Sequence, residues 1–170
     1  LKQSLEKILE ADRRLETAPP PVLLLGETGS GKTSFARWIH QNGPRSSAPF
    51  IELNCSALPE NLVEAELFGA EKGAFTDARS ARMGLFEAAD GGTLFLDELP
   101  SLPIALQAKD LTAIEDLKIR RLGSHREISV NVRLIAASNQ DLRELIKRCE
   151  FREDLYHRLD LFRLLLPPLR

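Results

Sequence analysis

A glycine-rich stretch of eight residues constrains the fold of this chain more than any other feature. Residues 26–33 read Gly-Glu-Thr-Gly-Ser-Gly-Lys-Thr and match the phosphate-binding pattern G-x-x-x-x-G-K-[ST] without a gap. The apolar run Val22–Leu25 predicts a buried strand before the loop, and residues 34–40 predict a helix after it. The stretch therefore predicts an α/β domain with a nucleoside-triphosphate site.

Each residue type in this loop has a chemical reason. The glycines let the backbone turn tightly, so that several N–H groups point at one phosphate cluster, and the following helix adds the positive end of its dipole. Lys32 brings a compact positive charge to the β- and γ-phosphates, and the Thr33 hydroxyl is a ligand for Mg²⁺. A chance glycine-rich turn is the alternative, but it requires the whole pattern and both flanking elements to agree by accident. We therefore expect the whole loop to bind nucleotide, namely Gly26, Glu27, Thr28, Gly29, Ser30, Gly31, Lys32 and Thr33.

A second apolar strand, further along the chain, ends in two carboxylates. Residues 93–98 read Thr-Leu-Phe-Leu-Asp-Glu. Asp97 can hold Mg²⁺ through water, and Glu98 can polarise an attacking water molecule. The alternative is a solvated strand end, but the phosphate loop upstream favours the catalytic interpretation.

The rest of the hydrophobic pattern alternates between strands and helices. Further strands are predicted at 50–54, 133–139 and 161–166, helices near the N-terminus and at 59–68, 83–89, 102–117, 141–148 and 152–159, and a hairpin around 123–126. This alternation predicts a mainly parallel, five-stranded sheet covered by helices on both faces. Asp110 falls on the apolar stripe of its helix, where a carboxylate buried without a partner costs roughly 1–3 kcal/mol; a place at the edge of the stripe is the other possibility.

Residues 69–79 fit neither a helical nor a strand period. Phe75 lies there among small residues. A lone aromatic in such a segment is usually tucked against the surface, and periodicity alone favours this interpretation. A presented aromatic that contacts a partner is the other.

The composition is that of one globular domain without a nucleic-acid surface of its own. The chain has 170 residues, 43% of them hydrophobic, and a net charge of −2, whereas a chain that grips DNA by itself usually carries a basic excess. It contains neither a membrane-spanning run nor a signal-peptide pattern. Cys55 and Cys149 are isolated, which indicates a reduced compartment. Because the chain begins at Leu1 and its single methionine is Met83, we expect it to be part of a longer protein.

Five segments together, in this order, resemble the central AAA+ ATPase domain of sigma-54-dependent bacterial transcription activators, the enhancer-binding proteins. They are the phosphate loop, Glu-Leu-Phe-Gly at 66–69, Gly-Ala-Phe-Thr-Asp-Ala at 73–78, the strand and its carboxylates at 91–98, and Phe-Arg-Glu-Asp-Leu at 151–155. The resemblance runs from about residue 21 to 170. It implies an AAA+ P-loop NTPase fold, with residues 1–18 as an N-terminal helix or linker and 19–170 as the α/β part of a sigma-54 interaction domain. The helical lid that follows in the family is expected to be absent.

The resemblance also implies a role for each matching residue. Asp97 and Glu98 become the Walker B pair, with Mg²⁺ held by Thr33 and Asp97. Asn54 matches the residue that restrains the Walker B glutamate, and Asn139 matches the sensor that reads the γ-phosphate.

Two arginines, Arg152 and Arg158, match fingers that act on the site of a neighbouring subunit, each worth on the order of 10³–10⁵ in rate. From spacing alone, an ion pair between Arg158 and Asp154, one turn earlier on the same helix, is the favoured interpretation. The resemblance favours the finger instead.

The implied activity is ATP hydrolysis, with ATP and Mg²⁺ as cofactors, that remodels the closed complex of sigma-54 RNA polymerase in the bacterial cytoplasm. Because fingers in trans require neighbours, the resemblance implies a ring, usually a hexamer. DNA is expected to be contacted through a domain outside this chain, and no membrane is involved. The implied contacts with sigma-54 come from the irregular segment, namely Gly73, Ala74, Phe75, Thr76, Asp77 and Ala78.

One departure from the family pattern keeps alternatives open. Asp77 replaces a glycine of the family's loop, and a charged side chain is less free at positive φ. A nucleotide-gated interaction module without turnover or sigma-54 coupling is therefore one alternative. A P-loop small-molecule kinase is another. An AAA+ unfoldase is a third, against which the match at 73–78 argues.

Overall fold

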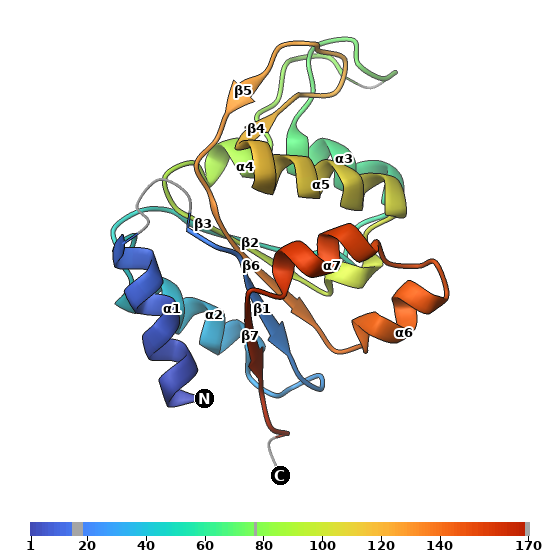
Figure 1. The fold of residues 1–170 in the computed structure, drawn as a ribbon. Coiled ribbons are helices and arrows are strands. Elements are labelled where there is room, and N and C mark those ends of the chain that lie inside the picture. The colour runs from blue at the N-terminus through green and yellow to red at the C-terminus, as the bar shows by residue number, and fades with distance from the viewer. Residues whose placement is uncertain (15–18, 77, 169–170) are drawn as a thin grey trace.

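A parallel sheet of five strands forms the centre of the molecule (Figure 1). The computed structural model describes residues 1–14, 19–76 and 78–168. The strands lie in the order β2-β3-β6-β1-β7, and every neighbouring pair is parallel. Their bounds are β1 (Val22–Leu25), β2 (Phe50–Asn54), β3 (Thr93–Asp97), β6 (Arg133–Ser138) and β7 (Phe162–Leu165). The predicted five-stranded parallel sheet is confirmed.

Helices cover both faces of this sheet, as the alternating pattern predicts. Val22 and Leu24 pack into the core under α1 (Lys2–Arg14) and α2 (Lys32–Asn42), whereas Leu23 packs into the core on the opposite face, because successive residues of a strand point to opposite sides. The second core is covered by the remaining helices: α3 (Glu60–Phe68), α4 (Leu85–Ala88), η1 (Leu99–Ser101), α5 (Ile104–Asp116), α6 (Leu142–Lys147) and α7 (Glu153–Leu159). In Figure 1 this face carries α5 and α7, stacked one above the other.

The N-terminal helix α1 is part of the same core as α2. Its residues Leu5 and Ile8 are buried, and Asp12 forms an ion pair with Arg133 at the start of β6, both side chains being almost fully buried. Removing one partner of such a pair leaves an uncompensated charge in the core. The pair therefore fastens α1 to the sheet. Leu15, which shares the apolar spacing of this helix, lies outside the described residues.

A two-part projection stands above α3 and α5 in Figure 1. One part is the antiparallel hairpin of β4 (Lys118–Ile119) and β5 (Ile128–Ser129), with shorter strands than the alternation of residues 118–130 suggests. The other is the segment 69–84. Backbone bridges join Ala70 to both Arg82 and Leu122, so the segment and the hairpin are hydrogen-bonded to each other at their base.

Asp110 lies in the interior of the protein and not at the edge of the apolar stripe. Asp110, on α5, is 0% exposed, and neither of its carboxylate oxygens has a hydrogen-bond partner among the residues that the structure describes. Burial raises the pKa of this carboxyl group to about 7, because a low-dielectric core disfavours the charged form. Asp110 is therefore a buried carboxyl group on α5 without a hydrogen-bond partner among the described residues.

We expect Asp110→Leu to stabilise the domain above neutral pH. The folded state holds a proton that the unfolded chain releases at acidic pH, so stability falls as the pH rises from about 4 to about 7 and then stays low. A pKa rise from 3.8 to about 7 corresponds to a penalty of up to roughly 4 kcal/mol. Urea unfolding of both proteins at pH 5 and pH 8 measures the difference. Asp116→Leu, at an exposed position of the same helix, is the matched control, and an unchanged pH dependence in Asp110→Leu would contradict the expectation.

The two cysteines lie in opposite environments. Cys55 is 2% exposed, and burial, followed by the negative charges of Asp110, Asp97 and Glu98, raises the pKa of its thiol above the usual range. Cys149 is exposed and adopts a left-handed backbone conformation, with φ 59°, in the turn between α6 and α7. Only Cys149 is therefore accessible to solvent.

Candidate functional site

The phosphate loop lies at the carboxyl edge of the sheet, directly after β1. The Gly26 N–H donates to the carbonyl of Ser138, at the end of the neighbouring strand β6 (3.2 Å). Gly29 and Gly31 have φ values of 83° and 89°, which other residues adopt only with strain, and an added Cβ at either position meets no atom within 4 Å. These two glycines are thus required by backbone conformation, and the loop surface beside them is open.

Lys32 begins α2 and is held beneath the loop. Lys32 is 6% exposed, and its Nζ donates to the carbonyl oxygens of Gly26 (2.8 Å) and Glu27 (2.9 Å). The N–H groups of the first helical turn have no partner within the helix and carry the positive end of its dipole. The loop, the ammonium and the helix end thus place positive charge around one small volume, as a triphosphate requires.

The acidic pair lies at the end of β3, at the same edge of the sheet. The Asp97 carbonyl accepts from the Cys55 N–H (2.9 Å), which continues the pairing of β2 with β3. The Asp97 carboxylate accepts from the Glu98 N–H (2.9 Å), and Glu98 adopts a left-handed backbone conformation with φ 54°. Because non-glycine residues rarely adopt this conformation, it marks Glu98 as a strained position of the kind found at functional sites.

Asn139 makes direct contact with the phosphate loop. It follows β6, and its Nδ2 donates to Thr28 Oγ1 (2.9 Å). The two residues are far apart in the sequence and meet because β6 and β1 are neighbours that end at the same edge. This hydrogen bond joins the predicted sensor position to the predicted nucleotide-binding loop.

Asn54 ends β2 opposite Asp97 in the register of the sheet. Its Oδ1 accepts from the N–H (2.9 Å) and the hydroxyl (2.7 Å) of Ser56. The structure therefore brings Asn54 to the end of β3 but bonds its side-chain oxygen to its own turn. Restraint of Glu98 by Asn54 stays a prediction.

The oxygen donors at this edge fit Mg²⁺. Thr33 supplies a hydroxyl from the first turn of α2, and Asp97 supplies a carboxylate from the end of β3; Mg²⁺ prefers such ligands together with phosphate oxygens and water. Among the residues that the structure describes, no group of three or more His, Cys, Asp or Glu side chains forms an all-protein metal cage. The donors thus suit a metal that is bound together with a nucleotide.

A cavity of about 460 Å³ opens beside the loop. It is lined by Gly26 and Glu27 of the loop and by Asn139, Tyr156 and Arg163.

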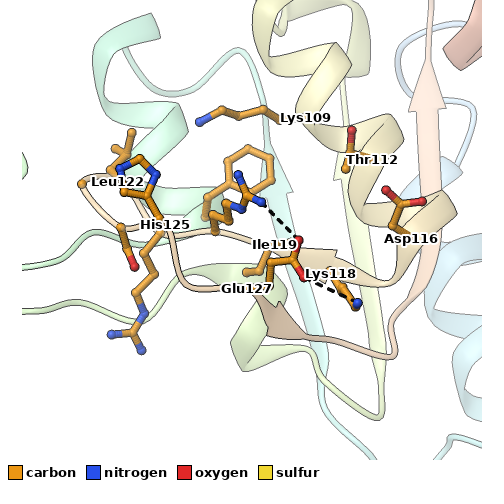
Figure 2. A pocket seen from close by; sticks show the side chains of 13 residues that line it. Lys109, Thr112, Asp116, Lys118, Ile119, Leu122, His125 and Glu127 are labelled. Atoms are coloured by element: carbon orange, nitrogen blue, oxygen red, sulfur yellow. Dashed lines mark hydrogen bonds and ion pairs between the residues drawn. The ribbon is translucent and has the colours of Figure 1, made fainter.

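A second cavity, of about 520 Å³, lies between α5 and the hairpin (Figure 2). Most of its charged groups are already paired: Lys118 and Arg120 with Glu127, and Lys109 with Glu64. Of these two cavities, it is the smaller one that borders the phosphate loop and Asn139.

The two predicted finger arginines differ in their surroundings. Arg152 precedes α7 and forms two hydrogen bonds with Asp154, from Nε to Oδ1 (3.0 Å) and from Nη2 to Oδ2 (2.8 Å), which raise the pKa of the guanidinium. Asp154 thus pairs with Arg152 and not, as the spacing allows, with Arg158. Arg158 lines a small cavity with Pro21 and Val132, and its Nε is buried without a hydrogen-bond partner among the described residues.

Arg158 lies near the opposite edge of the sheet from the phosphate loop of its own chain. Pro21 precedes β1 and Gly26 follows it, so five residue steps of about 3.3 Å each place these two residues about 16 Å apart. Arg158 shares its cavity with Pro21 and not with the loop. The fold therefore directs this arginine away from the nucleotide site of the same chain.

The predicted partner-contact segment is exposed and fixed at its base. Phe75 is 45% exposed, which does not fit an aromatic tucked against the surface. The Gly73 N–H donates to the Ala78 carbonyl (2.8 Å), and the Ala78 N–H donates to the Phe75 carbonyl (3.0 Å). These bonds close a tight loop that presents Phe75 and Thr76. Asp77 lies outside the described residues.

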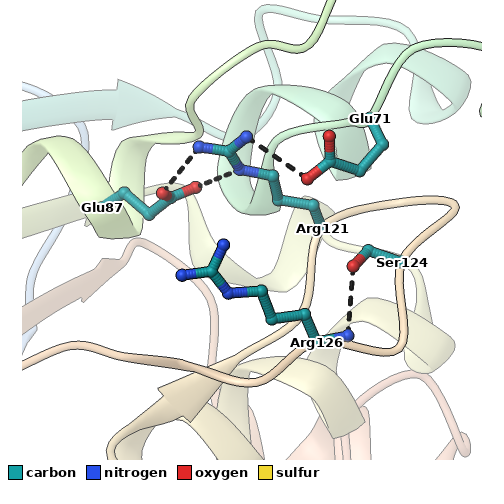
Figure 3. A network of polar contacts seen from close by, with 5 residues as sticks. All are labelled: Glu71, Glu87, Arg121, Ser124 and Arg126. Carbon is teal, nitrogen blue, oxygen red and sulfur yellow. Dashed lines mark hydrogen bonds and ion pairs between the residues drawn. The ribbon is translucent and has the colours of Figure 1, made fainter.

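The hairpin supports this loop through contacts and charge. An added Cβ at Gly123 lies 2.8 Å from that of Ala74, so the two tips are packed together. Figure 3 shows Arg121 donating to both carboxylate oxygens of Glu87 on α4 (2.9 Å each) and to Glu71 at the base of the loop (3.4 Å). Sequence reasoning predicted the hairpin but missed this arginine, whose partners lie far away in the sequence.

Comparison with known proteins gives a consistent result. A family model described as the sigma-54 interaction domain matches residues 1–165. The chain is 48% identical to the transcriptional regulatory protein FlbD of Caulobacter vibrioides over 167 residues, which are 98% of this chain and 37% of FlbD. It is 53% identical to the regulatory protein AtoC of Escherichia coli over 149 residues, which are 88% of this chain and 32% of AtoC. The chain thus spans about a third of the length of these curated relatives.

Solved structures give the same fold. NtrX from Brucella abortus in complex with ATP superposes with a TM-score of 0.81 at 31% identity, covering 96% of this chain and 35% of that chain. The P-loop NTPase domain of the sigma-54 transport activator from E. coli superposes with a TM-score of 0.59 at 19% identity, covering 100% of this chain and 99% of that chain. The second likeness shows the fold alone. Together with the sheet order, these likenesses confirm the predicted P-loop NTPase fold of the AAA+ type.

Proposed function

Because this chain belongs to the family of sigma-54 interaction domains, we propose that it is the ATP-hydrolysing motor of a transcriptional activator that remodels sigma-54 RNA polymerase. Residues 19–170 form the α/β part of this motor, and residues 1–18 lead into it. Its place of action is the bacterial cytoplasm, and other parts of the protein make the contact with DNA. The complex of NtrX with ATP supports ATP as the nucleotide.

One observation carries the proposal. The phosphate loop, the acidic pair and Asn139 converge on one edge of the sheet, and Asn139 is hydrogen-bonded to Thr28 of the loop. Three different strands deliver these groups, so the fold and not the local sequence brings them together. A phosphate-binding loop with an adjacent acid pair and a polar sensor suits hydrolysis of a terminal phosphate.

Positioning and electrostatics supply the catalysis. The N–H groups of the loop and the Lys32 ammonium hold the β- and γ-phosphates, and Glu98 orients the attacking water molecule. Mg²⁺, held by Thr33 and Asp97, neutralises charge on the phosphate oxygens when bound. Asn139 reads whether the γ-phosphate is present, because its partner Thr28 lies in the loop that binds it.

A neighbouring copy completes each site. Phosphoryl transfer spreads negative charge over the leaving group, and an arginine from an adjacent subunit stabilises that charge. Arg152 and Arg158 are the candidates, since Arg158 is directed away from its own loop. A head-to-tail contact of this kind closes into a ring, and we propose a hexamer.

The loop of residues 73–78 is the contact with sigma-54. Phe75 is exposed on it, and the hairpin supports it from behind. An exposed aromatic residue on a braced loop is the kind of anchor that dominates protein–protein binding energy.

We expect Glu98→Gln to lower ATP hydrolysis by about 10²- to 10⁴-fold, the usual contribution of a general base, with ATP affinity retained. Phosphate release without any added acceptor, measured over a range of protein concentrations, is the readout, and the rate per subunit is expected to rise as rings form. Glu150→Gln, at an exposed position outside the site, is the control.

Other outcomes point to other functions. ATP binding without turnover at any concentration would make the chain a nucleotide-gated interaction module. Phosphate transfer only in the presence of an acceptor molecule would make it a kinase.

A further inference from the structure

Gln107 is a buried polar residue that the proposed mechanism does not use. It lies on α5, which packs against α7 in one hydrophobic core, and it is 0% exposed. A buried amide is costly unless its donors and its acceptor are satisfied. The hydrogen-bond partners of the Gln107 amide therefore show which backbone segments this residue connects.

All three hydrogen bonds of the Gln107 side chain are made to backbone groups. Its Nε2 donates to the carbonyls of Leu102 (2.9 Å) and Glu150 (3.2 Å). Its Oε1 accepts from the N–H of Arg152 (2.9 Å). The amide nitrogen faces two acceptors and the amide oxygen faces a donor, so this orientation of the amide is the only one that satisfies all three partners.

The contact with Arg152 fixes the backbone of one of the two predicted fingers. Arg152 is the N-cap residue of α7, and no side-chain hydrogen bond caps this helix at that position; an arginine side chain has no acceptor with which to make one. Just before it, Phe151 is 2% exposed and packs into the core. The backbone is thus held from inside the protein, while the guanidinium points outward and is held by Asp154.

The hydrogen bond from Gln107 to Leu102 is made close to the acidic pair. The Leu102 N–H donates to the Leu99 carbonyl (3.0 Å), and the Ser101 N–H donates to the Glu98 carbonyl (2.9 Å). The turn whose Leu102 carbonyl accepts the hydrogen bond from Gln107 therefore comes directly after Glu98. Gln107 joins this turn to the start of α7 with one rigid amide.

We propose that Gln107 is a positioning residue that sets the reach of Arg152 toward the nucleotide of the neighbouring subunit. This inference rests on the proposed function, because it takes Arg152 to act in trans. Loss of the amide leaves Arg152 on the same helix but frees its backbone N–H and the preceding turn. Catalysis depends strongly on such placement, since a shift of about 1 Å costs on the order of 100-fold in rate.

The test is Gln107→Met in the full-length protein, because methionine keeps the length of the side chain and removes all three hydrogen bonds. We expect the turnover rate to fall by about 10- to 100-fold and the affinity for a non-hydrolysable ATP analogue to stay unchanged. Gln107→Asn, which keeps an amide but is too short to reach Arg152, is expected to behave in the same way. Gln41→Met, at an exposed position on α2, is the matched control and is expected to change neither quantity.

Mixing experiments separate positioning from general damage. Lys32→Ala subunits have no nucleotide site of their own but carry an intact Arg152. In rings mixed one to one with Gln107→Met subunits, about half of the Gln107→Met sites face an intact finger, so the turnover per Gln107→Met subunit is expected to recover to about half of the wild-type value. Absence of recovery in rings of normal size would overturn the inference, and so would loss of analogue binding in both Gln107 variants.

Arg152→Ala distinguishes failure of this inference from failure of the proposed function. If Arg152→Ala hydrolyses ATP at the wild-type rate, the finger assignment fails and the inference fails with it. If Arg152→Ala is inactive and is rescued by mixing while Gln107→Met is not rescued, only the role of Gln107 is wrong.

Discussion

Replacing Arg158 with alanine is expected to lower the rate of ATP hydrolysis by about 10³- to 10⁵-fold, the range measured for arginine fingers, while ATP affinity stays unchanged. The physical reason is the place of this side chain. Arg158 lies near the edge of the sheet opposite its own phosphate loop and has no hydrogen-bond partner for Nε among the described residues. We therefore expect its removal to leave the binding of nucleotide within the chain intact and, in the proposed trans role, to remove charge stabilisation from the site of the neighbour.

Complementation between two inactive proteins checks that the arginine acts in trans. Arg158→Ala subunits keep their nucleotide sites, and Lys32→Ala subunits keep their fingers, so mixed rings are expected to hydrolyse ATP although neither protein does so alone. Arg14→Ala, which removes an exposed ion pair with Glu10 on α1, serves as the control. If mixed rings assemble and stay inactive, Arg158 acts within its own chain or on stability alone.

Replacing Phe75 with alanine is expected to abolish activation of transcription while ATP hydrolysis continues. Phe75 is exposed on a closed loop, far in the sequence from every group of the nucleotide site. Truncation of an aromatic anchor at an interface typically costs about 2–4 kcal/mol of binding energy, which is roughly 30- to 1,000-fold in affinity for sigma-54. The loss should appear as weaker binding of sigma-54 in the presence of a transition-state analogue of ATP hydrolysis, and as absence of open promoter complexes.

A matched control for this substitution lies at the base of the same segment. Met83 is also a large apolar residue and is 59% exposed, but it lies outside the tight loop closed by Gly73 and Ala78. Met83→Ala is expected to leave activation intact. Equal losses in both variants would show that general exposure of apolar surface, and not the presented aromatic residue, makes the contact.

The sequence was sufficient to predict the sheet and the edge at which the candidate site residues meet. The strands β1, β3 and β6 are short, mainly apolar runs that end in polar or glycine residues, so the runs before Gly26, Asp97 and Asn139 also locate the site. Parallel strands end at one edge, and that rule alone brings these residues together. The hydrogen bond between Asn139 and Thr28 is a detail that follows from this arrangement.

Contacts between distant segments could not be predicted in this way. Asp154 has two arginines within reach along the chain, and only the three-dimensional structure shows that it pairs with Arg152. In the sequence, Gln107 looks like an ordinary polar residue of an amphipathic helix. Its structural role depends on hydrogen bonds to the backbone of Glu150 and Arg152, which are distant in the sequence. Local patterns carry no information about such partners, because packing and not periodicity selects them.

Asp110 illustrates the opposite situation. The periodicity of the helix identifies a conflict at this position, and the structure locates it in the core with no partner among the described residues. The pattern gave the direction of the energetic effect, whereas its size depends on complete burial, which only the packing of the helix against the sheet decides.

The contrast between the two cysteines has a practical consequence. A thiol-reactive dye requires an accessible sulfur, and only Cys149 offers one, since Cys55 is buried. Cys149 stands three positions before Arg152 in the sequence. A fluorophore attached to Cys149 would mark the start of α7, next to the predicted finger Arg152. If copies assemble as proposed, energy transfer between labelled copies would follow the approach of neighbours as ATP is consumed.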